Sequence, residues 1–589
     1  MLVKKRYKSM ILGFFLIGFS FFICENTVIA QLVSSKEDHN KKEQKKPVPQ
    51  EANYYINMFS KVYNKVKEKY VDEIDDVEML KSGIRGMLRP LDPYTKFLIG
   101  ESKAKLEMLT KGKYGGVGIR IGLRKDVLTV LSLMESGPAG KAGILPGDQI
   151  VRVDEFSTSG LEISEISKKI RGELGSTVYL EVIRPWNDDE NIIFELKRSN
   201  IIIQDVPYSG VDEQKIGYIK VRKFSKHAAK DFKSAVQSLS QESIEGLIID
   251  LRGNSGGLLR NAIDILDFLV PKGQTLLKVK GRKSRQDKIY RSKKDPILKT
   301  SVPLVVLVNR KSASASEIVS GVLQDVDRAV VMGKLSYGKG LVQKIYDLDE
   351  FSTVKVTAAK YYLPSGRLIQ RQDYFEDSSA LVSQISEKDK VYKTQKGRNV
   401  KGGGGITPDI VVESARIPSF VSAIWAEDAF LSFAVMYAHK NKLQAPITVT
   451  DKMVKEFQTY LKTYDLEFSF VGEKSFEKMK EDLLEFENLE SINIKSKSGS
   501  SVQEMLSKME KFFEKQKLNP FEHPKHIFWI KNGLRKELSL IVGGEKERIY
   551  AGLIDDVQYQ EAKKFILEDQ SYVKILEVPK KKDDPSSFQ

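Results

Sequence analysis

Residues 302–343 read VPLVVLVNRKSASASEIVSGVLQDVDRAVVMGKLSYGKGLVQ. The unbroken apolar run at 302–308 predicts a buried strand, and the run at 329–332 predicts a second one. Between them lie small polar residues and then a helical pattern, so the stretch predicts the order strand, turn, helix, strand. In α/β units of this kind, ligand-binding and catalytic residues lie at the carboxyl ends of the strands and the amino ends of the helices.

The turn of this unit contains a candidate nucleophile. Ser312, Ser314 and Ser316 lie at the predicted amino end of the helix. A serine there is by itself a helix cap. The same position would let free backbone N–H groups and the positive helix end hold an oxyanion. A nucleophilic serine needs a base, and Lys339, between two glycines, could serve if burial lowers its pKa. Spacing alone leaves both interpretations open.

Three short segments of this stretch together resemble one peptidase family. They are SASASE at 312–317, QDVDRA at 324–329 and YGKGLVQ at 337–343. The family is that of the carboxyl-terminal processing, or tail-specific, serine peptidases, and the resemblance extends over residues 52–414. It implies a crotonase-like (ClpP-like) peptidase core of the α/β class, in agreement with the alternation of apolar strands and amphipathic helices from residue 200 onward.

The resemblance also implies roles for individual residues. Ser314 would be the nucleophile and Lys339 the general base, while Gln343 would orient the lysine. Ser312 and Ser316 would then be packing or capping residues. No metal and no organic cofactor is implied.

A glycine-rich loop, GNSGG at 253–257, follows another predicted strand. By the same resemblance, a backbone N–H group of this loop would form the oxyanion hole together with that of Ala315. Either Gly256 or Gly257 could be the donor, and a purely structural turn is the alternative interpretation.

Residues 112–200 resemble a PDZ domain. The segment YGGVGI at 114–119 is similar to the loop that binds a chain-terminal carboxylate, and 137–143 and 145–150 resemble later PDZ turns. The tail of a partner would add as a strand while backbone N–H groups hold its carboxylate. The residues of this loop are Gly116, Val117, Gly118 and Ile119. Arg171 lies where some family members have an arginine that couples the PDZ domain to the active site; a solvated surface arginine is the alternative.

At 589 residues the chain is too long for one hydrophobic core, so several domains are expected. The fold class is α/β multidomain. The predicted order is a signal peptide at 1–30, a disordered linker at 31–50, a helical N-terminal domain at 51–111, the PDZ domain at 112–200, the peptidase core at 201–414 and a mainly helical C-terminal domain at 415–589.

The net charge of +16 would suit a nucleic-acid-binding protein, but the basic residues are scattered or lie in predicted loops. This pattern favours a solvated, lysine-rich surface with some attraction to anionic membranes. The chain has 5 histidines, and none has the spacing of a zinc motif.

The N-terminus predicts export. Basic residues at 4–8 precede an apolar run at 10–23, which is the pattern of a secretory signal. Cleavage after Ala30, lipidation at Cys24 and retention as an uncleaved anchor are the three alternatives. Each places the protein outside the cytoplasm, in the periplasm or cell envelope and close to a membrane.

Together these features predict an exported serine endopeptidase that captures C-terminal tails with its PDZ domain and cleaves near them with a Ser–Lys dyad. Its partners would be proteins with free, apolar C-terminal tails, and not nucleic acid. The alternative is a non-catalytic PDZ scaffold or adaptor that presents tails to another protease. A homo-oligomer and an activating adaptor are both compatible with the resemblance.

Overall fold

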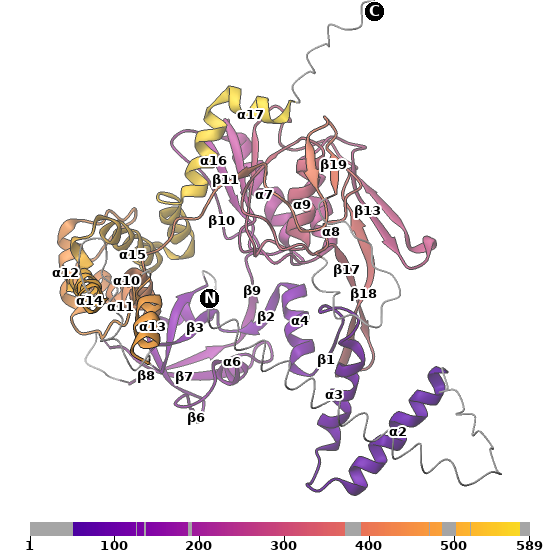
Figure 1. The fold of residues 1–589 in the computed structure, drawn as a ribbon, viewed down its shortest axis with the longest axis horizontal. Coiled ribbons are helices and arrows are strands. Elements are labelled where there is room, and N and C mark those ends of the chain that lie inside the picture. The colour runs from indigo at the N-terminus through magenta and orange to yellow at the C-terminus, as the bar shows by residue number, and fades with distance from the viewer. Residues whose placement is uncertain are drawn as a thin grey trace, which may run out of the picture. The chain divides into compact units, whose positions relative to one another are not determined.

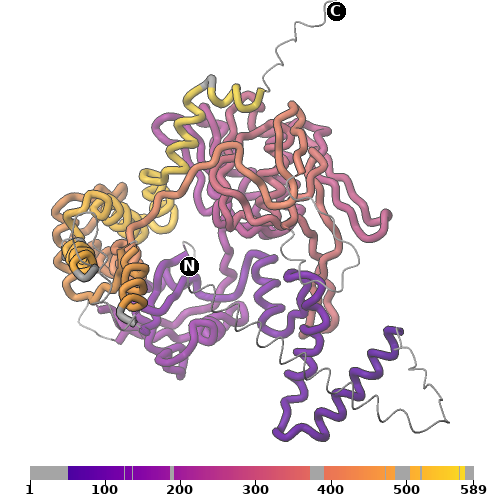
Figure 2. Tube along the Cα trace, viewed as in Figure 1, coloured from indigo at the N-terminus to yellow at the C-terminus, as the bar shows by residue number. Residues whose placement is uncertain are grey.

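A computed structural model describes residues 51–124, 126–134, 137–185, 191–371, 390–470, 472–485, 502–518 and 520–577. The predicted signal peptide and linker, with Cys24 and Ala30, lie outside the described residues. The chain divides into two compact units, Met1–Ser82 and Gly83–Gln589, and each is described by itself. Figure 1 labels the helices and strands, and Figure 2 traces the same chain by residue number.

The described part of the first unit contains helix α2 (Ala52–Lys69) and the start of α3 (Asp76–Leu88). Lys67 and Lys69 lie in the last turn of α2, where positive charge favours the helix dipole. Lys67 also forms an ion pair with Asp76. Neither helix has a buried residue.

The predicted PDZ region forms an antiparallel sheet in the order β3-β4-β5-β7-β8, with β6 paired to β5. Alternate strand residues and one face of α6 make its core, which includes Val130, Ile150, Ile166 and Leu180. A separate pair, β2 with β9, brings the two ends of this region together. The elements are β2 (Lys113–Gly116), β3 (Ile119–Arg124), β4 (Val127–Leu133), α5 (Pro138–Ala142), β5 (Gln149–Val153), β6 (Phe156–Ser157), α6 (Ile163–Ile170), β7 (Thr177–Ile183), β8 (Asn191–Lys197) and β9 (Ser199–Ile202).

The peptidase core is built on a sheet in the order β10-β11-β12-β15-β16-β21, in which β11 to β21 are parallel. The strand, turn, helix and strand predicted from residues 302–343 are confirmed as β15, α9 and β16. The elements are β10 (Tyr208–Val211), β11 (Ile216–Lys220), α7 (Ala228–Gln241), β12 (Gly246–Asp250), α8 (Leu259–Leu266), β15 (Leu304–Val308), α9 (Ala315–Asp325), β16 (Val330–Gly333) and β21 (Ile410–Val411).

Both faces of this sheet are covered, as unbroken apolar strands require. Because side chains alternate along a strand, Ile249 and Val306 pack in one cluster with α7, α8 and α9. Ile248 and Val305 point the other way, into a cluster formed with α16 (Val557–Leu567) and α17 (Asp569–Leu576). The last helices of the chain therefore complete the peptidase core (Figure 1).

A second sheet has the order β1-β18-β13-β14, with β17 paired to β18. Strand β1 comes from the region predicted to be the helical N-terminal domain, and it pairs with β18 from Lys96 opposite Lys355 to Ile99 opposite Ser352. The elements are β1 (Lys96–Ile99), α4 (Glu101–Lys111), β13 (Thr275–Gly281), η1 (Ser284–Gln286), β14 (Lys288–Arg291), β17 (Leu341–Asp347), β18 (Ser352–Tyr362), and the separate hairpin β19 (Val391–Lys393) and β20 (Asn399–Lys401).

The region after residue 415 is mainly helical, as predicted. Aromatic residues such as Phe430, Phe433 and Phe457 form the centre of its own core. Helix α15 continues through a non-helical residue, Gly544, toward α16. The elements are α10 (Ser419–Ala426), α11 (Ala429–Asn441), α12 (Asp451–Leu461), α13 (Glu473–Glu485), α14 (Val502–Leu518), η3 (Pro520–Glu522) and α15 (Pro524–Leu553).

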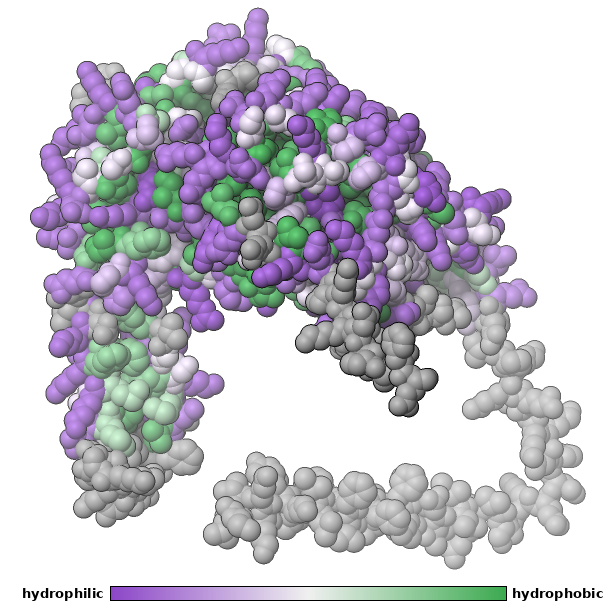
Figure 3. Space-filling view, turned by 90° about the horizontal axis from the view of Figure 1, so that it is seen from above, coloured by the Kyte–Doolittle hydropathy of each residue, from purple (hydrophilic) through white to green (hydrophobic). Residues whose placement is uncertain are grey.

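Hydrophilic side chains cover most of the face seen in Figure 3, and hydrophobic ones form small patches among them. Among the described helices, none alone is both long and apolar enough to cross a membrane. The pair α10 and α11 meets that test only together, across a bend of 66°.

Candidate active site

Ser314 is the residue at which β15 turns into α9. It is the N-cap of the helix and has φ 55° and ψ −112°, a backbone conformation that non-glycine residues rarely adopt. Such a residue costs about 1–3 kcal/mol and persists only where its surroundings hold it. The flanking serines do so, because Ser312 Oγ donates to the Leu251 carbonyl (2.9 Å) and Ser316 Oγ to the Asn254 carbonyl (2.8 Å).

The glycine-rich loop lies directly against this turn. A Cβ on Gly256 would lie 2.8 Å from Ser314 Cβ and 3.0 Å from the nitrogen of Ala315, so only glycine fits there. The Gly256 N–H is already bound, since it donates to Asn254 Oδ1 at 2.9 Å. Within the described residues, no hydrogen-bond acceptor is found for the N–H groups of Gly257 and Ala315. These two N–H groups are the ones available to an oxyanion.

One cavity of about 340 Å³ brings the predicted active-site residues together. Its lining includes Ser314, Ala315, Lys339, Gln343, Gly256 and Gly257. Gln343 Nε2 donates to Thr357 Oγ1 in a long contact of 3.4 Å, and its amide lies on the cavity wall. The residues predicted as nucleophile, base and oxyanion donors thus line one cavity.

The Lys339 side chain lines this cavity, and its Nζ lies 4.7 Å from the centre of the Tyr94 ring. Burial lowers the pKa of Lys339 to about 8, because a desolvated ammonium is disfavoured. The positive charge of Lys355 also lowers it, while the carboxylates of Glu317 and Asp92 oppose both effects. With this pKa about a tenth of Lys339 is neutral at pH 7, and the neutral fraction that can act as a general base rises with pH.

Glu317 ties the Ser314 turn to the segment that contains Lys339. Its Oε2 accepts the N–H groups of Ser314 (2.8 Å) and Lys339 (2.9 Å), and its Oε1 accepts those of Gly338 (2.6 Å) and the Ser336 hydroxyl (2.5 Å). Burial raises the pKa of Glu317, and these four donors act against the rise. Because all four partners donate, the carboxylate form fits the site.

The predicted tail-binding residues line a different groove, of about 200 Å³, on the PDZ sheet. It is bounded by β3 and by α6, whose Ile163, Ser167 and Ile170 form the opposite wall. The predicted residues in its lining are Gly116, Val117, Gly118, Ile119 and Arg171. The Arg171 guanidinium lies 5.1 Å from the centre of the Tyr114 ring, so it is part of this groove and not of the Ser314 cavity.

Family models match four parts of the chain. They are described as Peptidase family S41 (residues 215–379), PDZ domain (115–197), Activating protease CtpB N-terminal domain (17–101) and Probable PDZ-protease, C-terminal helical domain (420–566).

A similar protein, the carboxy-terminal-processing protease of Bartonella bacilliformis, is 32% identical over 390 residues, which cover 66% of this chain and 79% of that protein. The chain belongs to the carboxy-terminal-processing protease family. CtpA of Bacillus subtilis is 29% identical over 435 residues, 72% of this chain and 90% of that protein. A solved structure, a photosystem II D1 C-terminal processing protease, is 27% identical with a TM-score of 0.33, covering 61% of this chain and 92% of that one.

Three residues of this serine-type peptidase were missed by the sequence analysis as parts of the site. In the sequence, Glu317 stands out only as the last residue of the SASASE segment. Lys355 lies on β18 and lines the cavity because β18 pairs with β17, the strand that follows Lys339. Tyr361, also on β18, donates its hydroxyl to the Lys339 carbonyl at 2.5 Å. Among the described residues, no group of three or more His, Cys, Asp or Glu side chains is placed to hold a metal ion.

Lys355 gives the protease a testable pH dependence. Its positive charge lowers the pKa of Lys339, so the substitution Lys355→Met should raise that pKa. The neutral fraction of Lys339 would fall at pH 7, and the midpoint of the kcat/KM profile would move to higher pH, while rates at strongly alkaline pH converge with those of the native protease. Lys360→Met, on the same strand but outside the cavity lining, should leave the midpoint unchanged. A midpoint that stays fixed in Lys355→Met would contradict this role.

Proposed function

We propose that this protease is an exported serine endopeptidase that captures C-terminal tails in its PDZ groove and cleaves near them with a Ser314–Lys339 dyad. The observation that carries the proposal is the shared cavity, which is lined both by a serine at a strained helix N-cap and by a lysine whose pKa is lowered to about 8. A non-catalytic scaffold would require neither a strained serine nor a lysine with a lowered pKa.

Each step of the proposed reaction can be assigned to a residue of this chain. Neutral Lys339 Nζ takes the proton of Ser314 Oγ as this oxygen attacks the carbonyl carbon of the scissile bond. The N–H groups of Ala315 and Gly257 hold the negative oxygen, a contact whose loss in such sites costs about 10²–10³-fold in kcat. Protonated Lys339 gives its proton to the leaving amine. A water molecule, deprotonated by Lys339, then hydrolyses the ester on Ser314.

Export is the part of the proposal that the sequence supports, through the basic start and the apolar run at 10–23. The enzyme would act in the periplasm or cell envelope, near the membrane. Its substrates would be proteins with free, apolar tails. The domain boundaries given in the sequence analysis are part of the same proposal.

Cleavage of paired peptides tests the proposal. Two substrates with an apolar last residue, one ending in a free carboxylate and one in an amide, should be cut at the same bond but at different rates. A charge-assisted hydrogen bond contributes about 1.5–3 kcal/mol, so the amide should lower kcat/KM by about 10- to 100-fold. The rates are measured by mass spectrometry at concentrations below KM.

Two results would contradict the proposal in different ways. Equal rates for acid and amide would remove the PDZ groove from substrate selection. Tight binding of the acid peptide without cleavage under any condition would instead favour the alternative function, a PDZ scaffold that presents tails to another protease.

A further inference from the structure

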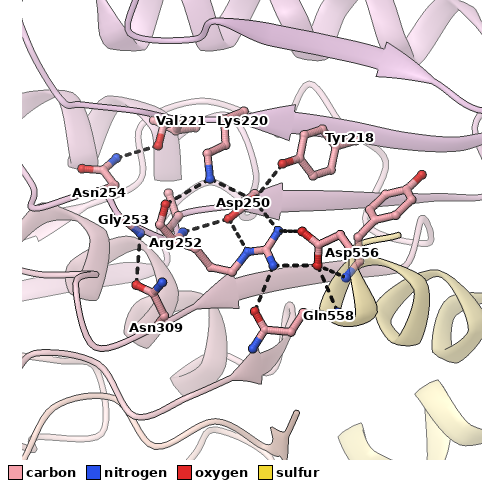
Figure 4. Close-up of polar contacts among 12 residues, drawn as sticks. Tyr218, Lys220, Val221, Asp250, Arg252, Gly253, Asn254, Asn309, Asp556 and Gln558 are labelled. Carbon is pink, nitrogen blue, oxygen red and sulfur yellow. Dashed lines mark hydrogen bonds and ion pairs between the residues drawn. The ribbon is translucent and has the colours of Figure 1, made fainter. Parts of the chain in front are cut away.

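An ion-pair network joins the C-terminal helix α16 to the strand end that leads into the oxyanion loop (Figure 4). Asp556, the N-cap of α16, accepts two hydrogen bonds from the guanidinium of Arg252, from Nη1 at 2.9 Å and from Nη2 at 2.7 Å. Gln558 Oε1 accepts a further one from Nη1 at 2.9 Å. A planar guanidinium held by two oxygens of one carboxylate has a fixed orientation as well as a fixed position.

The opposite side of Arg252 is held by the buried carboxylate of Asp250. This carboxylate accepts the Arg252 backbone N–H at 2.8 Å and its side-chain Nε and Nη2 at 3.0 and 2.7 Å. Tyr218 and Lys220 also donate to Asp250. Lys220 Nζ donates to the Arg252 carbonyl at 3.0 Å. Both backbone groups and the whole side chain of Arg252 are thus fixed.

From Arg252 the chain runs directly into the loop that ends at Gly257. The Gly253 N–H donates to Asn309 Oδ1 at 3.0 Å. Asn254 Nδ2 donates to the Val221 carbonyl at 2.9 Å, and its own carbonyl accepts the Ala313 N–H at 3.0 Å. The loop is therefore held at its start by Arg252 and further along by its own hydrogen bonds to Asn309, Val221 and Ala313.

We propose that Asp556 is a positioning residue of the protease, which holds the oxyanion loop in register with Ser314 through Arg252. The inference rests on the proposed oxyanion role of Gly257. It makes α16 part of the catalytic apparatus, in addition to its role in covering the sheet. A displaced N–H group weakens binding of the charged transition state more than binding of the neutral substrate carbonyl. Loss of Asp556 should therefore act on kcat and not on KM.

The substitution Asp556→Asn separates this role from capping. Asp556 Oδ1 accepts the N–H groups of Gln558 and Tyr559 at the start of α16, and an asparagine oxygen preserves that cap. The amide nitrogen of asparagine would instead face Arg252 Nη2, donor against donor. In the full-length protein, kcat should fall about tenfold or more with KM unchanged, since small misplacements of reacting groups cost up to about 10²-fold. Labelling of Ser314 by a fluorophosphonate should slow by the same factor.

Lys563→Met is the matched control. Lys563 lies on the same helix and forms an ion pair of 2.6 Å with Asp212, between β10 and β11. Its loss should lower the thermal midpoint without slowing kcat. Asp556→Glu, which restores a carboxylate, should recover part of the lost rate. If Asp556→Asn does not fold, Gln558→Met, which removes one acceptor of Arg252 without a change of charge, takes its place and should also lower kcat.

Fluorophosphonate labelling distinguishes failure of the proposed function from failure of the positioning role. If the native protein is not labelled at Ser314, the proposed function itself is wrong. If the native protein is labelled but the Asp556 and Gln558 variants that fold react at the native rate, only the positioning role is overturned. A kcat loss in Lys563→Met equal to that in Asp556→Asn would also overturn it, because the effect would then come from general loosening of α16.

Discussion

Replacing Ser314 by alanine should abolish peptide cleavage while leaving the protease folded. The hydroxyl is the only group that the substitution removes, and loss of a nucleophile that works in a unit with its base costs on the order of 10⁴–10⁶ in kcat. The strained backbone of Ser314 is held by hydrogen bonds of Ser312, Ser316 and Glu317, so the turn should persist in the variant. Cleavage of a free-acid tail peptide and fluorophosphonate labelling should both be lost, with an unchanged circular dichroism spectrum.

The two flanking serines are the controls. Their hydroxyls donate to backbone carbonyls, at Leu251 for Ser312 and at Asn254 for Ser316. Alanine at either position should lower the free energy of unfolding by about 1 kcal/mol and keep measurable activity. Near-normal turnover in Ser314→Ala, with loss of activity in Ser312→Ala or Ser316→Ala, would place the nucleophile elsewhere in the triplet.

Much of the site was predictable because its signals are local. An unbroken apolar run, a cluster of small residues and a helical period define β15 and α9 without knowledge of the rest of the chain. Ser314 and Lys339 stand out in that frame because a lysine between two glycines at a strand end is unusual. The resemblance to a known family then supplied what spacing could not, namely the expectation that the two residues form a catalytic dyad.

The parts that were not predictable depend on contacts between distant segments. The choice between Gly256 and Gly257 rests on the hydrogen bond from Gly256 to the Asn254 side chain. An amphipathic pattern near residue 560 indicates that a face is buried but does not say against what. Only the fold shows that α16 covers the peptidase sheet and contacts Arg252. The role of Lys355 also cannot be predicted from the sequence. Its charge lowers the pKa of Lys339 only when the fold brings β18 close to the Lys339 turn.

Glu317→Gln should lower kcat/KM by about 100-fold or more, since it disturbs the nucleophile and the base together. The carboxylate accepts from four donors, which belong to Ser314, Ser336, Gly338 and Lys339. A glutamine amide replaces one of the accepting oxygens by an NH₂ group, so two of these donors would face another donor. Buried donors left without acceptors cost about 1–3 kcal/mol each, and the turn would relax away from its strained conformation.

The pH profile distinguishes this role from simple destabilisation. The negative charge of Glu317 raises the pKa of Lys339, so its removal should lower that pKa and move the midpoint of kcat/KM to lower pH, opposite to Lys355→Met. Asp327→Asn is the control, because it removes another buried carboxylate, one paired with Arg398 just beyond the far end of α9. It should reduce stability without a shift of the midpoint. A loosened fold would expose Lys339 to water and raise its pKa toward the usual value. A midpoint that moves upward in Glu317→Gln would therefore indicate unfolding of the site and contradict the role of Glu317 in holding the Ser314 turn and Lys339 together.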